Sequence, residues 1–206
     1  GTEDDEELIE VEKETKSVKH WKIHGHHGGL RAAGINGVQT GRGMDYLIID
    51  DPMKGIEQAD SLPYKARQER NYHGTLYHRV EPGGGIIIIA TRWAIDDLPG
   101  RLLSAAALDP EADQWEVITI RARCEPGEED PLGRKPGEWM WGRRTPEQWE
   151  RLKNNYIDRI TGEPNREWLA LFQQRPIPEE GAIFKPMEWF TFADPPLDPG
   201  LRYGFI

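Results

Sequence analysis

Two short apolar runs and one longer amphipathic stretch stand out in the first 90 residues of the chain. Residues 46–49 and 86–90 are continuous runs of apolar, mostly branched side chains. Runs of this length without polar alternation predict strands that are buried on both faces of a parallel sheet. Between them, Asp60 or Ser61 can cap a helix that extends over about 62–79.

The alternation of elements continues to residue 120. Asp96 or Asp97 stands at the start of a helix expected over about 98–107, and the alternating pattern of 115–120 predicts a third strand. Strand, long helix, strand, helix, strand is the order found in α/β sheets, so we expect the α/β class for this part of the chain.

Proline and glycine become frequent after residue 121, which indicates a change of subdomain. A helix is expected from Pro146 to about Ile160, a shorter one over about 165–172, and an aromatic strand-like segment over 184–192. Before the first strand, the glycine-rich segment 25–37 predicts tight turns and no regular helix.

We therefore expect four parts in this chain. They are an acidic arm (1–20), an α/β core (21–120), a small helical accessory subdomain (121–178), and a linker with the first strand of a further domain (179–206). The chain opens on an acidic stretch and stops in a strand-like segment, 201–206, so we expect a fragment of a longer protein.

Charge and cysteine content exclude several classes of protein. The chain has 36 acidic and 26 basic residues and a net charge of −10, so any contact with nucleic acid must come from a local patch. A single cysteine, Cys124, excludes an internal disulfide framework and a cysteine-rich zinc site. No apolar run is long enough for a membrane span and no signal peptide opens the chain, which favours a soluble intracellular protein.

The sharpest chemical feature is the pair Asp50 and Asp51 at the end of the first predicted strand. Open α/β sheets bind ligands in the crevice outside the carboxyl ends of their strands. In a nucleotide hydrolase the first acid of such a pair holds hydrated Mg²⁺, and the second orients the attacking water. The alternative interpretation is a strand that ends in an Asp-Pro turn, with no catalytic role.

Three further groups of residues are candidates for a functional site. Thr91 follows the second strand, where its hydroxyl could sense a γ-phosphate or simply bond the backbone. Arg42 lies on a glycine-flanked loop before the first strand, where it could reach the phosphates of a neighbouring subunit or be an ordinary exposed arginine. The histidines at 20, 24, 26 and 27 have no carboxylate or cysteine at ligand spacing, which favours surface or backbone-bonding roles.

One motif is missing from the sequence. No G-x-x-x-x-G-K-[ST] loop occurs in these residues, and backbone amides of such a loop are what cradle the phosphates of ATP. The chain by itself is therefore not expected to be a complete ATPase.

Taken together and in order, the motifs from His20 to Ile206 resemble the large terminase subunit of tailed bacteriophages, the DNA-packaging motor. Each segment is weakly specific alone, and the ordered set carries the resemblance. The segments are His20-Trp21, Gly28-Gly29-Leu30-Arg31-Ala32-Ala33-Gly34, Thr40-Gly41-Arg42-Gly43, Leu47-Ile48-Ile49-Asp50-Asp51-Pro52-Met53-Lys54, Ala59-Asp60-Ser61, Thr91-Arg92-Trp93, Asp96-Asp97-Leu98, Pro131-Leu132-Gly133-Arg134, Phe172-Gln173-Gln174-Arg175-Pro176, Glu180-Gly181 and Phe184-Lys185.

The resemblance implies a P-loop NTPase-like parallel sheet flanked by helices, here only in part, followed by the start of an RNase H-like nuclease domain. It implies ATP and Mg²⁺ as cofactors. Asp50 would be the Walker B residue that holds Mg²⁺ and Asp51 the catalytic carboxylate. Thr91 would be the coupling residue at the nucleotide, and Arg42 the arginine that acts in trans.

The resemblance also implies partners and a location. The intact motor would form a homo-oligomeric ring in the host cytoplasm at the procapsid portal, translocate double-stranded DNA, cut it, and work with the portal protein and the small terminase subunit. It implies that the phosphate loop precedes Gly1 and that the first metal-binding aspartate of the nuclease follows Ile206.

Two rival hypotheses remain open from the sequence. One is a prophage remnant or scaffold that binds portal or DNA without hydrolysing ATP. The other is a helicase-like ATPase, which would share the chemistry of the two strands but not the segments 172–176 and 180–185.

Overall fold

The computed structural model describes residues 10–14, 17, 19–35, 43–142 and 144–178. In this part of the chain it is a mixed α/β structure with five α-helices, one two-stranded parallel sheet and one two-stranded antiparallel sheet. The α/β class expected for the first part of the chain is thereby confirmed.

The parallel sheet pairs β3 (Met44–Asp50) with β4 (Val80–Ile89), in a register that places Asp50 beside Ile89. Both strands predicted from the apolar runs are confirmed. The register slips near the start of β3, and Gly84 lies opposite this irregularity. A Cβ on Gly84 would lie 2.3 Å from the carbonyl oxygen of Asp45, so only glycine allows the two backbones to approach here.

A series of helical segments, interrupted at Ser61, connects the two strands. It begins with α1 (Ile56–Asp60) and α2 (Leu62–Asn71), and continues through a π-helical turn (Tyr72–Leu76) and a 3-10 turn (Tyr77–Arg79). Ser61 caps α2, because its hydroxyl accepts a hydrogen bond from the Tyr64 amide at 3.4 Å. The helix predicted over 62–79 is confirmed, while α1 was not predicted.

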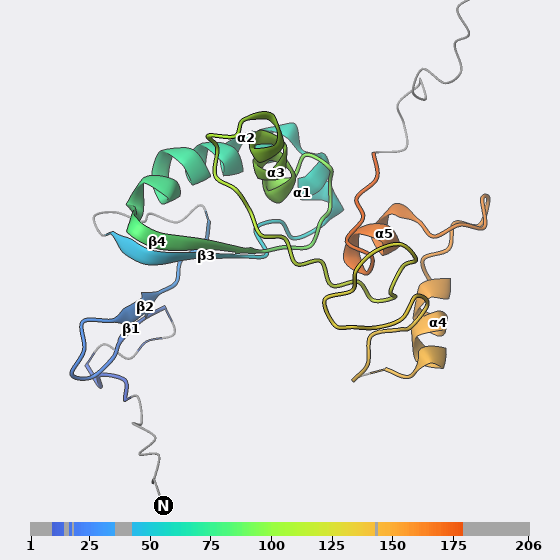
Figure 1. Cartoon of the computed structure of the whole chain (residues 1–206), viewed down its shortest axis with the longest axis horizontal. Helices are drawn as coiled ribbons and strands as arrows, with labels where there is room; N and C mark the ends of the chain where they lie inside the picture. The colour runs from blue at the N-terminus through green and yellow to red at the C-terminus, as the bar shows by residue number, and fades with distance from the viewer. Residues whose placement is uncertain (1–9, 15–16, 18, 36–42, 143, 179–206) are drawn as a thin grey trace, which may run out of the picture.

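Helices cover one face of the parallel sheet (Figure 1). Leu47 and Ile49 of β3 pack against Tyr72 and Leu76 from the helical connection, and against Leu98 and Leu102 of α3 (Leu98–Leu108). Asp97 caps α3 by accepting a hydrogen bond from the Gly100 amide at 2.9 Å, so the expected cap is also confirmed.

The other face of the parallel sheet is uncovered by the described residues. Tyr46 is 68% exposed, Ile48 56%, Ile87 47% and Ile89 56%. The prediction that both strands are buried on both faces is therefore wrong for this structure. Two strands with helices on one side only bury the inward-facing half of each apolar run.

The prediction of a third strand over 115–120 is wrong. These residues form no strand, and Val117, Ile118 and Ile120 are exposed. Trp115 alone packs against the core that lies over β3 and β4. Strand-forming residue types give no strand unless a partner edge is hydrogen-bonded to them.

The accessory region contains α4 (Pro146–Asn154) and α5 (Arg166–Leu171) around a core that includes Trp149 and Trp168. The helix expected from Pro146 to Ile160 ends six residues early. The Asp158 carboxylate accepts hydrogen bonds from the amides of Ile160 and Thr161, both at 2.8 Å, and this local turn replaces further helix.

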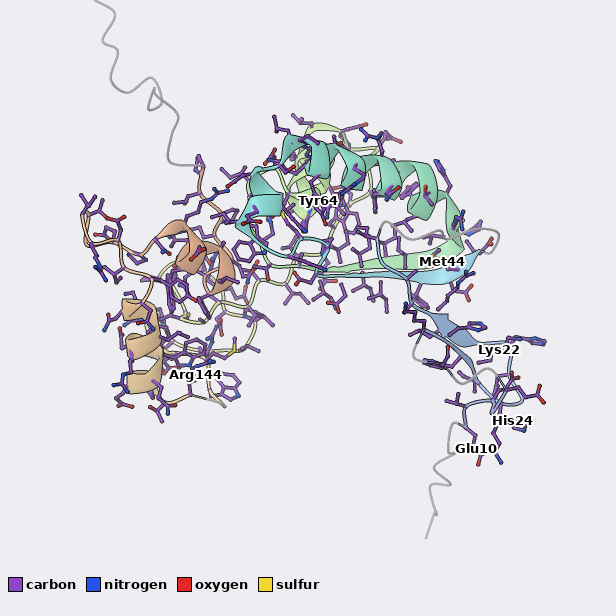
Figure 2. All side chains as sticks on the ribbon, turned by 180° about the vertical axis from the view of Figure 1, so that it is seen from behind. Glu10, Lys22, His24, Met44, Tyr64 and Arg144 are labelled. Carbon is purple, nitrogen blue, oxygen red and sulfur yellow. The ribbon has the colours of Figure 1, made fainter. Side chains whose placement is uncertain are left out.

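An antiparallel hairpin precedes the parallel sheet and extends away from its amino end (Figures 1 and 2). It pairs β1 (His20–Lys22) with β2 (Gly29–Arg31), which agrees with the turns predicted for the glycine-rich segment. The strand-like segments expected over 184–192 and 201–206 lie outside the described residues. In the part that the structure covers, no helix is long and apolar enough to cross a membrane.

Candidate functional site

The carboxyl ends of β3 and β4 meet at one edge of the parallel sheet, which faces the accessory region in Figure 1. Asp50 ends β3, and the amide of Asp51 donates a hydrogen bond to the carbonyl oxygen of Ile89 at 2.8 Å. Asp50 and Asp51 are both exposed, and Thr91 follows Ile89 by two residues. The structure therefore brings three of the four predicted site residues to the same sheet edge.

Asp51 has a left-handed backbone conformation, with φ of 42°. A non-glycine residue rarely adopts this conformation unless the surrounding structure holds it there. The next residue, Pro52, is buried, and its carbonyl oxygen accepts hydrogen bonds from the Tyr64 hydroxyl at 2.9 Å and from the Gln68 side-chain amide. Two side chains of α2 thus fix the turn that carries Asp51.

The turn after β4 is fixed by a second set of contacts. The amide of Arg92 donates a hydrogen bond to the Gln174 side chain at 3.1 Å, and the Arg92 Nε atom donates to Asp97 at 2.9 Å. The Asp97 side chain is 2% exposed, and a buried charge is costly unless it is paired. The Arg92 side chain and the amides of Ala94 and Gly100 supply this compensation. A Cβ on Gly100 would lie 1.9 Å from the Ile95 carbonyl oxygen, which explains a glycine in this helix.

Helix α5 of the accessory region packs beneath both turns. Ala170 is fully buried and belongs to one apolar cluster with Met53 from the turn after β3 and with Trp93 and Ala94 from the turn after β4. Arg166 also forms an ion pair with Asp60, with a 2.9 Å hydrogen bond between them. Because one helix supports both turns, the accessory region and the sheet edge form a single packed unit.

Two residues of this arrangement were missed by sequence reasoning. The sequence places Gln68 in a predicted helix and Gln174 in a motif, and predicts no role for either side chain. An uncharged glutamine that bonds a backbone group gives no charge or spacing signal, so neither contact could be found from the sequence. The positive φ of 52° at Gln174 is likewise a feature of the folded chain.

Arg42 lies outside the described residues. The next residue, Gly43, precedes the first residue of β3, and β3 spans seven residues. At about 3.3 Å per residue, the seven steps from Gly43 to Asp50 span about 23 Å, so Gly43 lies at the opposite end of the strand.

Charge pairs strengthen the frame around the site. The Lys65 ammonium, whose side chain is 7% exposed, donates to Asp96 at 2.7 Å and joins α2 to the start of α3. Partial burial raises the pKa of Asp96, but the hydrogen bond and charge of Lys65 outweigh this effect and hold the pKa below its usual range. In the accessory region the Arg134 guanidinium hydrogen-bonds Asp130 and lowers the pKa of that carboxyl to about 2.

Among the described residues, no group of three or more histidine, cysteine, aspartate or glutamate side chains could hold a metal ion. A nucleotide-bound Mg²⁺ needs fewer protein ligands, because phosphates and waters supply most of its coordination and the protein adds one or two carboxylates. The exposed Asp50 and Asp51 fit that requirement. The side chains of His24, His26 and His27 are exposed. His24 lies on the hairpin, apart from this edge (Figure 2).

Comparisons of the chain with protein-family models, with curated proteins and with solved structures found no match.

Proposed function

We propose that this chain supplies the metal-holding and water-orienting acids of an ATPase, as part of a motor that resembles the large terminase subunit of tailed bacteriophages. One observation carries the proposal. Asp50 and Asp51 end a parallel strand at the edge where Thr91 follows the neighbouring strand. That is the edge at which open α/β sheets bind ligands.

Each of the three residues would have a separate role. Asp50 would accept hydrogen bonds from the water ligands of Mg²⁺, and Asp51 would orient the water that attacks the γ-phosphate in line. The bound Mg²⁺ would neutralise charge on the β- and γ-phosphates. Thr91, which follows the neighbouring strand, would contact the γ-phosphate and report its loss. The fixed turn at Asp51 supports this role, because a water-orienting carboxylate must be held in place before the reaction.

The uncovered sheet face supports the proposed P-loop type of fold. Parallel sheets are found with both faces covered, so large apolar side chains such as Ile48 and Ile87 need a covering layer. Asp50 is two residues after Ile48 in β3, and residues two apart in a strand lie on the same face of the sheet. We propose that a phosphate-loop segment, with its strand and helix, packs on this side of the sheet and brings the nucleotide to Asp50.

The position of Gly43 favours action of Arg42 in trans. The distance of about 23 Å along β3 separates Gly43 from phosphates that would bind beside Asp50 of the same chain. A homo-oligomeric ring would bring Arg42 to the site of the adjacent subunit. The same proposal includes double-stranded DNA, the portal protein and the small terminase subunit as partners.

The test is turnover of ATP by a complete subunit that contains this sequence. Asp51→Asn is expected to retain binding of a non-hydrolysable ATP analogue and to lower turnover by about 10²- to 10⁴-fold, since only the water-orienting step is lost. The matched control is Asp45→Asn, which changes an exposed acid near the opposite end of β3. Undiminished turnover in the Asp51 variant would refute the assignment, as would an equal loss in the control.

A further inference from the structure

The peptide group that joins Thr91 to Arg92 is held at both of its polar ends. Its carbonyl oxygen, on Thr91, accepts a hydrogen bond from the Trp93 amide at 3.1 Å. Its N–H group, on Arg92, donates to the side-chain oxygen of Gln174 at 3.1 Å, from a residue 82 positions further along the chain. Because a peptide group is planar and rigid, these two bonds fix its orientation and, with it, the place of the Thr91 Cα atom.

We propose that Gln174 is a positioning residue for the candidate site, and that its side-chain oxygen sets the place of Thr91 beside Asp50 and Asp51. The inference rests on the proposed function, in which the Thr91 hydroxyl contacts the γ-phosphate. That contact requires a hydroxyl within hydrogen-bond reach of a phosphate oxygen, and a misplacement of about 1 Å can cost about 10²-fold in rate. Gln174 itself touches no reacting group and acts through the backbone of Thr91.

Both ends of the Gln174 side-chain amide are used. The Oε1 atom accepts from the Arg92 amide, and the Nε2 atom donates to the carbonyl oxygen of Leu171, the last residue of α5, at 3.3 Å. The bond to Leu171 aims Oε1 at the turn after β4. A glutamate of the same length would accept but not donate, and a methionine would form neither bond. The residue type therefore matches a bridge between α5 and the sheet edge.

The backbone of Gln174 gives independent support. Its φ of 52° is left-handed, in a segment where the chain reverses after α5 and the Arg175 amide donates to the Leu169 carbonyl oxygen at 2.8 Å. Glycine is the residue that most often takes this conformation at a helix end, because it has no Cβ penalty. A glutamine here accepts that penalty and supplies a side chain that glycine lacks. The bond to Arg92 is what that side chain adds at the sheet edge.

The adjacent Gln173 shows the contrast with a structural glutamine. Its Oε1 atom accepts from the Arg123 amide at 3.0 Å, and its Nε2 atom donates to Glu125 at 2.9 Å. Both partners belong to the accessory region. Gln173 thus holds that region together, whereas Gln174 joins it to the turn that follows β4.

Three variants separate positioning from stability. Gln174→Met removes both bonds, and Gln174→Glu keeps the acceptor for the Arg92 amide but loses the donor to Leu171. The matched control is Gln148→Met, which removes a glutamine Oε1 atom that accepts from the Thr145 amide at 2.9 Å at the start of α4. The control loses a bond of the same kind without touching the turn after β4.

The first readout is amide hydrogen exchange of Arg92 in the ¹⁵N-labelled chain, followed by NMR. Exchange should become about tenfold faster in Gln174→Met, because its amide loses an acceptor, and should stay near the original rate in Gln174→Glu and Gln148→Met. An unchanged rate in Gln174→Met would overturn the proposal, since the Gln174 bond would then not hold the turn.

The second readout is ATP turnover by a complete subunit that contains this sequence, well below the unfolding midpoint of each variant. Gln174→Met should lower kcat by about 10- to 100-fold and change KM by less than about threefold, because other groups supply most of the nucleotide binding. Gln174→Glu should restore kcat to within about threefold although it is also less stable. A merely structural role predicts instead that kcat follows stability in all three variants, and that result would overturn the proposal.

Asp51→Asn in the same subunit distinguishes this inference from the proposed function. If Asp51→Asn is inactive while Gln174→Met keeps its kcat, the positioning role is refuted and the proposed function stands. If Asp51→Asn turns over ATP like the unchanged subunit, the proposed function fails and the role of Gln174 at that site fails with it. Loss of turnover in both, with recovery in Gln174→Glu, supports both.

Discussion

The carbonyl group of Pro52 offers the sharpest test of the claim that α2 fixes the turn at Asp51. This buried oxygen accepts from the Tyr64 hydroxyl and from the Gln68 side-chain amide, and no other described group donates to it. Gln68 is 2% exposed, and its own Oε1 atom has no partner among the described residues. The two donors therefore contribute to stability in different ways.

Tyr64→Phe removes one donor and leaves nothing newly unpaired, because Gln68 still serves the carbonyl. The expected loss in the free energy of unfolding is about 1 kcal/mol. Gln68→Met also removes a donor, at about the same cost, but it eliminates the unpaired Oε1 atom, which costs about 1–3 kcal/mol when buried. The two terms predict a neutral variant or one stabilised by up to about 2 kcal/mol.

The double variant Tyr64→Phe with Gln68→Met leaves the Pro52 carbonyl buried without a donor. The additional cost of that orphaned group is about 1–3 kcal/mol, so the two changes should be non-additive by at least about 1 kcal/mol. The assay is urea unfolding followed by tryptophan fluorescence, with midpoints compared at constant m-value. Additivity within about 0.5 kcal/mol, or a Gln68→Met variant that loses more than about 2 kcal/mol, would refute the reasoning.

Three further changes have defined outcomes. Gly100→Ala should lower the free energy of unfolding by about 1–3 kcal/mol in the same urea assay, because the added Cβ would overlap a backbone oxygen. The control Gly74→Ala should be neutral or stabilising, because no atom lies within 4 Å of its added carbon. The Asp130 carboxyl has a pKa of about 2 in the folded chain and about 3.9 in the unfolded chain, so its contribution to stability is complete above about pH 3.9 and is lost as the pH falls towards 2. Asp130→Asn should therefore flatten the fall in the free energy of unfolding below about pH 4. An unchanged slope would contradict the ion pair. Ile48→Thr should reduce self-association in sedimentation experiments, because its side chain is 56% exposed on the uncovered sheet face, and a larger associated fraction would contradict this interpretation of the face.

The local elements were predictable from the sequence because their signals are local. Branched apolar runs indicated β3 and β4, and Ser61, Asp97 and Asn165 stand directly before α2, α3 and α5 as side-chain caps. The pair at the end of β3 could likewise be placed at a sheet edge, since strand order and direction determine where carboxyl ends meet.

The errors arose where the outcome depends on partners distant in the sequence. Among the described residues, the 115–120 segment has strand-forming residue types but no strand partner. The outer face of β3 likewise has apolar residues that no described segment covers. The contacts of Gln68 and Gln174 with backbone groups depend on how α2 and α5 pack. Gln68 is 16 residues from its partner Pro52 in the sequence, and Gln174 is 82 residues from its partner Arg92. No periodicity in the chain encodes such pairings.

The central claim is that this chain holds the acidic half of a nucleotide site whose phosphate-binding half lies elsewhere. The most direct measurement is the coding DNA on both sides of the sequence. The account predicts an open reading frame that continues upstream through a G-x-x-x-x-G-K-[ST] loop after a strand, and downstream to an aspartate directly after Ile206. A natural start codon at Gly1, or an uninterrupted upstream frame without any phosphate loop, would contradict the claim that Asp50 and Asp51 serve ATP hydrolysis.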